Sequence, residues 1–303
     1  MRGSIAAVSG LLATVSGHGL VTSITGANGV TMPGLSVADG TPRDCSSNRC
    51  GSQADTAIIR DREISDGRAG PLGRTQGNGV IDAATMIQNF MGTARAPQNN
   101  GAADSVGEED NISANFLNGR GGVFGRGLGD LLSGLIGGGG SGGSRGNKTQ
   151  TAAETRVAAT AGAGASAGLP TCADDGSITM TFRQINQDGA GPLEAAVDGT
   201  SGGTDAAAFQ TAEVTQDVPG AVLGLSLATN TDFPLTVQMP AGMTCDGSVG
   251  GADNVCIVRV RNSAVAGPFG GSAAFTQSPA ARKRAIAYRL KKRHDAQQNR
   301  RLR

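Results

Sequence analysis

Apolar and polar residues alternate along several runs in the C-terminal half of the chain. Ile178, Met180 and Phe182 alternate with polar neighbours, and the same pattern recurs in segments 235–239 and 256–261. Turn-forming stretches rich in Gly, Asp and Pro, such as NQDGAGP and CDGSVGGAD, separate these runs. Alternation with a period of two indicates strands with one buried face. The pattern therefore predicts a mainly β protein with a β-sandwich-like core.

Two segments of the N-terminal half carry helical signals instead. In the stretch VIDAATMIQNFMG, helical spacing puts Val80, Ala84, Ile87 and Met91 on one apolar face, and the following Gly92 is a natural C-terminal stop. The stretch DTAIIRDREISDG favours a second short helix. Closer to the N-terminus, HGLVTSITG predicts a strand that joins the same sheet. We therefore expect one or two short helices beside the β-rich core.

A glycine-rich stretch interrupts the chain between these two halves. Half of the residues from Gly119 to Gly146 are glycine, and the sequence that follows is rich in Ala, Thr and Gly. Glycine at this density has too much conformational entropy for a packed element. We therefore expect residues 96–170 to form a disordered insertion. The flanking segments, 18–95 and 171–278, are then the two parts of a single domain.

The first seventeen residues predict a signal peptide. Arg2 supplies a short positive region, a modest apolar run follows, and Val15, Ser16 and Gly17 end that run with small side chains. The alternative is that the run is a buried strand or helix of the core. It is too short for a bilayer anchor, which needs about 20 apolar residues, and no later segment comes close. We expect cleavage after Gly17, secretion to the extracellular space, and no integral membrane segment.

Charge is distributed unevenly along the chain. The formal net charge is +1, but the residues from His18 to Ala281 include 15 basic and 24 acidic residues, a net charge of about −9. From Arg282 onward there are ten Lys or Arg residues and one acidic residue, Asp295. The segment 279–303 is therefore a basic tail, and its composition favours a helix.

Three interpretations of the basic tail stay open. It is a solvated helix, a segment that binds anionic membranes or wall polymers, or an extension removed at the dibasic pairs 283–284, 292–293 and 300–301. Nucleic-acid binding is not expected. The chain is predicted to be secreted, and with no Trp and one Tyr it lacks the aromatic side chains on which bases stack.

The five cysteines are compatible with disulfides in an oxidising compartment. Cys45 and Cys50 bracket one short loop, and Cys245 and Cys256 bracket another. Both spacings suit local disulfides, although spacing alone leaves the connectivity open. Cys172 is then a free thiol or an intermolecular link. A zinc site would need closely paired thiolates or nearby histidines, which the sequence lacks.

Two sequons predict N-glycosylation. They begin at Asn111 and Asn147, in polar or Gly-rich surroundings that leave room for a glycan. Such triplets are also frequent by chance, so they support secretion only weakly.

Several motifs, in a fixed order, resemble those of a known fungal family. They include TPRDCSSNRCGSQADTAIIRDREI in the N-terminal half, then NQDGAGP after a strand, DFPL before MPAGMTCDG, NVCIVRV and AGPFGG. Together with HGLVTSITGANG they extend from His18 to about Phe275, apart from the insertion. These motifs resemble the fungal appressorium-associated secreted virulence factors, also described as powdery-mildew-type virulence factors. The resemblance implies a secreted, β-rich protein of early host-surface infection, without an assigned biochemical activity.

On this resemblance we expect a virulence-associated effector or surface protein that acts at the host interface during appressorium-stage infection. The expected partner is a host surface or cell-wall component. Catalysis is not favoured, because the second of the two histidines, His294, lies in the basic tail and leaves no Ser/His or Cys/His pair. We therefore assign no catalytic residue.

The alternative function depends on His18. After cleavage, an N-terminal histidine offers an amine and a ring nitrogen to one metal, as in the copper brace of lytic polysaccharide monooxygenases, and Asp188 is a candidate third ligand. Those enzymes have a second histidine, and this chain has Gly189 in the similar segment. The alternative is thus a copper-binding, polysaccharide-active protein with His18 and Asp188 as metal ligands. The simpler interpretation is that His18 merely follows the cleavage site.

Overall fold

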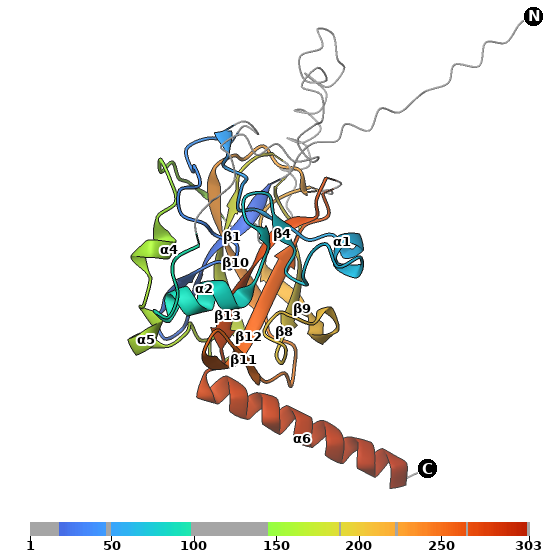
Figure 1. The fold of residues 1–303 in the computed structure, drawn as a ribbon. Coiled ribbons are helices and arrows are strands. Elements are labelled where there is room, and N and C mark those ends of the chain that lie inside the picture. The colour runs from blue at the N-terminus through green and yellow to red at the C-terminus, as the bar shows by residue number, and fades with distance from the viewer. Residues whose placement is uncertain are drawn as a thin grey trace, which may run out of the picture.

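The fold is built on a long antiparallel sheet (Figure 1). The structure is a computed structural model, and it describes residues 18–46, 50–97, 145–187, 189–221, 224–264 and 266–301. In chain order the strands are β1 (Gly19–Thr25), β2 (Thr31–Pro33), β3 (Ala57–Ile58), β4 (Arg74–Thr75), β5 (Gly79–Val80), β6 (Asn147–Lys148), β7 (Ser177–Gln184), β8 (Glu194–Asp198), β9 (Phe209–Gln216), β10 (Thr231–Gln238), β11 (Gly247–Val249), β12 (Ala252–Arg261) and β13 (Phe269–Thr276).

Strands from distant parts of the chain lie side by side in this sheet. Their spatial order is β2-β1-β7-β10-β9-β8-β12-β13-β3-β4-β5, with β6 paired to β10 and β11 paired to β12. The N-terminal strand β1 pairs with β7, and β3 pairs with β13. The two segments on either side of the predicted insertion therefore contribute to the same sheet.

The sheet curls until β1 packs against β13, although these two strands are not paired. At their closest approach, an added Cβ on Gly271 would lie 2.6 Å from the backbone nitrogen of Val21. Nearby, the nitrogen of Leu35 donates to the carbonyl oxygen of Ser272 at 2.9 Å. The mainly β class is confirmed, and the curled sheet is consistent with the predicted sandwich-like core.

The predicted alternation is present in the central strands. Phe182 of β7 lies opposite Phe233 of β10, and Met180 lies opposite Leu235; all four side chains are buried. In β12 the pattern changes, because four consecutive residues, 255–258, are buried. Strand β12 is therefore covered on both faces, whereas alternation alone predicts one buried face.

The described α-helices lie outside this sheet, and α6 projects away from it (Figure 1). They are α1 (Asp61–Ser65), α2 (Ala83–Phe90), α4 (Arg156–Ala159), α5 (Gly164–Ala167) and α6 (Pro279–Arg301), with a short 3₁₀ helix at Ala206–Ala208. Helices α1 and α2 lie in the two segments predicted to be helical, and these predictions are confirmed.

The buried face of α2 differs from the predicted one. Oδ1 of Asp82 accepts a hydrogen bond from the nitrogen of Ala84 at 2.9 Å, so Asp82 caps the helix, which begins at Ala83. Val80 therefore precedes the helix, in β5, and is 55% exposed. The apolar residues of α2 that pack into the core are Ala83, Met86, Ile87 and Phe90.

The prediction that residues 96–170 are disordered is wrong for residues 145–170. This part contains β6, α4 and α5, and Val157 and Leu169 are buried in the core. The burial of these apolar side chains offsets the conformational entropy that the small neighbouring residues lose on folding. The rest of the prediction, for residues 98–144, lies outside the described residues.

Candidate functional site

His18, the first described residue, lies in the interior of the fold. Its side chain is fully buried, and its ring centroid is 4.4 Å from that of Phe269. Its backbone nitrogen donates to Oδ1 of Asn186 at 2.6 Å, and its carbonyl oxygen accepts from the nitrogen of Ile185 at 2.9 Å. His18 is therefore packed tightly at the start of β1. The signal peptide predicted for residues 1–17 lies outside the described residues.

Gly189 packs so closely against His18 that no side chain fits there. An added Cβ on Gly189 would lie 2.0 Å from the carbonyl oxygen of His18. Asp188, the other candidate ligand, lies outside the described residues. Within the described ranges, no group of three or more His, Cys, Asp or Glu side chains is placed to hold a metal ion. Copper binding by His18 and Asp188 therefore stays a prediction, and we derive no chemistry from it.

Both local disulfides suggested by the cysteine spacing are present. Cys45 is bonded to Cys50, and Cys245 is bonded to Cys256. Cys172 is a free cysteine that is only 2% exposed, and burial raises the pKa of its thiol. Because an intermolecular disulfide requires an accessible thiol, the fold favours the free-thiol interpretation of Cys172.

One of the two predicted glycosylation positions can be located. Asn147 is exposed and belongs to β6, and the hydroxyl of Thr149, in the same sequon, donates to Oδ2 of Asp232 at 2.6 Å. Asn111 lies outside the described residues. Glycosylation at both positions stays a prediction.

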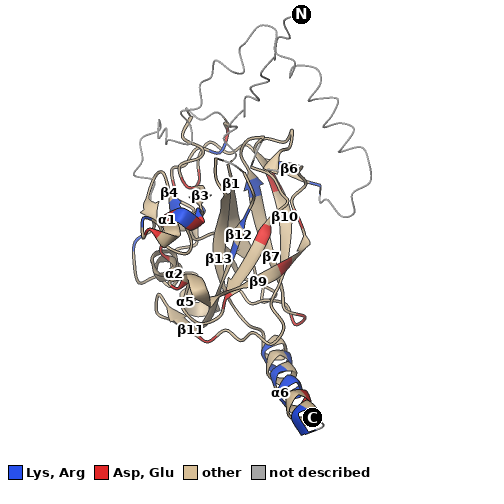
Figure 2. Cartoon of the chain, turned by 90° about the vertical axis from the view of Figure 1, so that its right-hand side faces the viewer, with Lys and Arg blue, Asp and Glu red and all other residues tan. Residues whose placement is uncertain are grey.

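The helix α6 projects from one end of the β-rich body (Figure 1). Nine of its 23 residues are Lys or Arg, and its one acidic residue is Asp295. From Ile286 to Arg301 every residue is exposed. Figure 2 shows Lys and Arg along the whole projecting helix, whereas basic and acidic residues are interspersed on the body. The basic tail predicted from the sequence is thus a helix that extends away from the body.

The start of α6 is defined by a Ser-Pro pair. The hydroxyl oxygen of Ser278 accepts a hydrogen bond from the nitrogen of Ala281 at 3.1 Å, and Pro279 occupies the first helical position. The same hydroxyl donates to Oδ1 of Asp174 at 2.8 Å, which connects the cap to the body. Sequence reasoning missed this cap, although Ser followed by Pro is a recognisable signal for a helix start.

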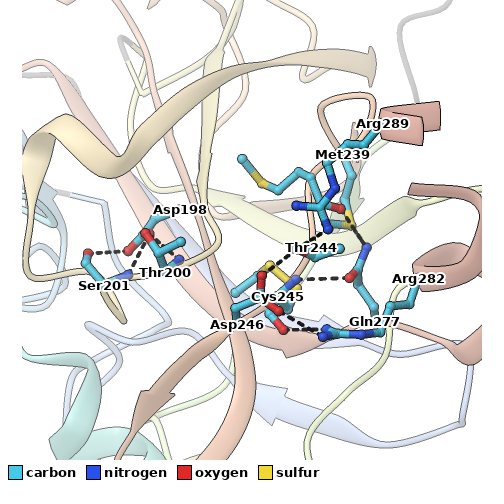
Figure 3. Close-up of a disulfide and its surroundings, with 12 residues drawn as sticks. Asp198, Thr200, Ser201, Met239, Thr244, Cys245, Asp246, Gln277, Arg282 and Arg289 are labelled. Carbon is cyan, nitrogen blue, oxygen red and sulfur yellow. Dashed lines mark hydrogen bonds and ion pairs between the residues drawn. A yellow bond between two sulfur atoms is a disulfide. The ribbon is translucent and has the colours of Figure 1, made fainter. Parts of the chain in front are cut away.

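The first turns of α6 are attached to the loop that carries Cys245 (Figure 3). Arg282 donates from Nη1 to the carbonyl oxygen of Cys245 at 2.8 Å and forms an ion pair of 2.9 Å with Asp246. Further along, Arg289 donates from Nη2 to Oγ1 of Thr244 at 3.2 Å. Because Cys245 is bonded to Cys256 in β12, these contacts connect the helix to the sheet.

Gln277 completes this attachment immediately before the helix. Its Oε1 accepts a hydrogen bond from the nitrogen of Cys245 at 3.0 Å, and its Nε2 donates to the carbonyl oxygen of Met243 at 3.0 Å (Figure 3). No local sequence pattern marks Gln277 or Asp246 for this role, because their partners come from other segments of the chain.

A cleft of about 410 Å³ lies where α6 meets the body. Ala281 and Ala285, the two buried residues of α6, line it, together with Met239, Met243 and Tyr288. These side chains are mainly apolar, and they come from both α6 and the body, so the helix meets the body around this cleft. After Ala285 every described residue of the helix is exposed.

Most of the charge on α6 has no acidic partner. Among the described residues, Arg282 is the one Lys or Arg of α6 that forms an ion pair with a carboxylate, that of Asp246. A hydrogen bond from Thr244, together with the hydrogen bond and charge of Arg282, lowers the pKa of Asp246. Apart from Arg289, which is bonded to Thr244, the other basic side chains of the helix are therefore available to an anionic partner. None of the helices in the described ranges has the length and apolar character needed to cross a bilayer.

Comparisons with known proteins confirm the family resemblance. Residues 16–270 match the family model described as Egh16-like virulence factor. The chain is 54% identical, over 291 residues, to the appressoria-specific virulence factor GAS2 of Pyricularia oryzae, an alignment that covers 95% of this chain and 93% of that protein. It is 40% identical, over 128 residues, to the appressoria-specific virulence factor GAS1 of the same fungus, covering 41% and 50% respectively. No solved structure matches the chain. The chain belongs to the Egh16-like virulence factor family.

Proposed function

We propose that this chain is a secreted, non-catalytic virulence factor that acts at the host interface during the appressorium stage of infection. Two of its relatives, GAS2 and GAS1, are appressoria-specific virulence factors. Two disulfides support an oxidising destination for the chain. The first contact with the host is electrostatic, between α6 and an anionic component of the host surface or cell wall.

The observation that carries this proposal is the projection of α6 from an acidic body. Residues His18 to Ala281 have a net charge of about −9, while α6 has nine Lys or Arg and one Asp. An anionic surface attracts the helix and repels the body. The molecule therefore approaches such a surface with α6 first.

Retention on an immobilised anionic polysaccharide, such as polygalacturonate, tests the electrostatic contact. The full chain is expected to bind at low salt and to elute as salt is raised from about 0.05 to 0.5 M, because screening weakens attraction between exposed charges. Deletion of residues 282–303 is expected to abolish most of the retention. Retention that is insensitive to salt, or equal retention of the deletion variant, would contradict the proposal.

N-terminal sequencing of protein secreted by the organism that produces it tests whether the chain is exported and where it is cleaved. Secreted protein that begins at His18 supports the proposal, because the predicted cleavage follows Gly17. Failure to detect the protein outside the cell at the appressorium stage would contradict secretion.

A further inference from the structure

Among the described residues, most of the large apolar side chains that are exposed lie on the basic helix α6. Of the five large apolar residues that are exposed in the described part of the chain, three lie on α6: Ile286 (40% exposed), Tyr288 (47%) and Leu290 (59%). The other two, Val80 and Leu227, lie outside α6. Charge alone explains neither the presence of these side chains on α6 nor their exposure, because a solvated basic helix has no need of large apolar residues.

Helix geometry divides these three side chains between two faces. Ile286 and Leu290 are four residues apart and therefore share one face. Lys283 precedes Ile286 by three residues, and Arg293 follows Leu290 by three, so both bases flank the apolar pair on the same face. The face thus presents two adjacent apolar side chains between two cations.

Tyr288 lies on the opposite side of α6, next to the body. An added Cβ on Gly242 would lie 2.9 Å from Cδ1 of this tyrosine, and Tyr288 lines the cleft beneath the helix. Because Tyr288 is directed toward the body, Ile286 and Leu290 point away from it. The face that carries the apolar pair is therefore the outward face of the helix.

We infer that the outward face of α6 binds an anionic lipid bilayer, with Ile286 and Leu290 entering the headgroup region and the surrounding Lys and Arg contacting acidic lipids. This inference rests on the proposed electrostatic contact and specifies its partner. A dissolved or wall-bound polyanion would neutralise the charges but leave the apolar pair in water. A bilayer interface accommodates both, because its acidic headgroups attract the cations and its headgroup region admits the apolar pair.

The shape of the molecule suits this contact. All residues of α6 after Ala285 are exposed, and the helix extends clear of the body in both views (Figures 1 and 2). Two apolar side chains are too few for insertion by themselves, so the charges must supply the initial attraction. Binding should therefore require acidic lipid and weaken with salt.

Flotation of the full chain with lipid vesicles tests the inference. The probes are vesicles of phosphatidylcholine alone and vesicles in which about 30% of the lipid is phosphatidylserine, an amount that gives a strongly negative surface. Binding is expected only to the second. The double variant Ile286→Ser/Leu290→Ser is expected to bind these vesicles about tenfold more weakly or worse. It should keep wild-type retention on immobilised polygalacturonate. Leu227→Ser removes an equally exposed leucine from the body and is the matched control, expected to bind as wild type.

Four outcomes would overturn the inference. If the full chain is retained by the polysaccharide but does not float with acidic vesicles, the lipid partner is wrong while the proposed function stands. If the double variant binds vesicles as tightly as wild type, the apolar pair has no part in binding. If light scattering shows a dimer that the double variant loses, and vesicle binding is absent, the outward face binds a second copy instead. If the full chain binds neither the vesicles nor the polysaccharide, the proposed electrostatic contact is wrong as well.

Discussion

The body and α6 both carry arginine, but the two regions use it differently. Arg43 and Arg183 in the body are each only 1% exposed, and both are bonded to carboxylates. In α6 every Lys or Arg after Ile286 is exposed, and Arg282 forms the one ion pair with a carboxylate found among the described residues of the helix. Arginine thus stabilises the fold in the body, whereas in α6 most basic side chains are free to contact an anionic partner.

Arg43 shows what a buried cation requires. Its guanidinium donates to both carboxylate oxygens of Asp55 and, from Nε, to Oε2 of Glu154 at 3.0 Å. Burial by itself would lower the pKa of Arg43, but the charges of Asp55 and Glu154 outweigh this and raise the pKa. Arg43 and Glu154 are 111 positions apart, so the network attaches segment 145–155 to the body.

Among the described residues, Arg183 forms an ion pair with one carboxylate, whereas Arg43 forms ion pairs with two. Nη1 donates to Oδ1 of Asp232 at 3.0 Å and to Oγ1 of Thr149 at 2.9 Å, and Nη2 donates to the carbonyl oxygens of Arg43 and Thr149. The side chain of Asp232 is 17% exposed, so it keeps contact with water. The difference between the body and α6 shows that the buried arginines Arg43 and Arg183 have carboxylate partners. Most basic side chains of α6 lack such partners and stay at the surface.

Replacing Arg43 with Met is expected to give the largest effect. The variant leaves Asp55 and Glu154 buried without their cation, so the free energy of unfolding should fall by about 3–5 kcal/mol. Urea denaturation at neutral pH measures the loss. Lys291→Met, on exposed α6, is the control and should change stability by less than about 0.5 kcal/mol. Equal stability of the two variants would break the contrast between body and helix.

Replacing Arg183 with Met should have a smaller effect, of about 2 kcal/mol. The carboxylate left behind, that of Asp232, is partly exposed and can be hydrated, unlike those of Asp55 and Glu154. The same urea titration measures it. A loss larger than that of Arg43→Met would show that exposure of the remaining acid does not govern the cost.

Acid pH tests the carboxylates of the body. Burial would raise the pKa of Glu154, but the charges of Arg43 and Arg156 outweigh this effect and lower the pKa. Burial would also raise the pKa of Asp198, but its hydrogen bonds, including the one from Ser201, outweigh this effect and lower the pKa. A carboxyl with a lower pKa in the folded state stabilises the protein above its unfolded pKa, near 4, and loses this contribution as pH falls through the folded value.

We therefore expect the free energy of unfolding to decline below about pH 5. In Glu154→Gln the decline should be shallower, because one of the perturbed groups no longer titrates. In Lys291→Gln/Lys292→Gln it should follow the wild type, because both positions lie on the exposed part of α6. Urea titrations at a series of pH values provide the comparison, and identical slopes for all three proteins would refute a role for Glu154.

Neutralising the exposed end of α6 should have the smallest effect on stability. In the triple variant Lys291→Gln/Lys292→Gln/Arg293→Gln the free energy of unfolding should change by less than about 0.5 kcal/mol. Elution from an anionic resin should nevertheless occur at clearly lower salt, because three available cations are lost. Unchanged elution would show that the charge of the helix is not available to a partner.

Local patterns predicted the regular elements well. Alternation identified β7 and β10, which pair with Phe182 opposite Phe233. The helical spacing located α2, but the cap at Asp82 shifted its start and therefore its buried face. Cysteine spacing suggested both local disulfides. These features depend on neighbours a few residues away, which is the range that a sequence pattern can report.

Features that depend on distant partners could not be predicted in this way. The low-complexity segment around Val157 resembles a linker, yet it is folded because Glu154 meets Arg43 and Val157 enters the core. Histidine is a residue type that often binds metals, but the sequence does not show that His18 is buried against Phe269 or that Gly189 packs against its carbonyl oxygen.

The sequence by itself determined the family, the mainly β class, and the separation of an acidic body from a basic, helix-forming tail. These follow from ordered motifs, from residue periodicity and from charge counts along the chain. Only the tertiary structure decided which cations are buried and which stay available, and that α6 stands clear of the body with Ile286 and Leu290 on its outward face. The reason is physical: burial and orientation depend on contacts between segments that are far apart in the chain, and these exist only once the fold has formed.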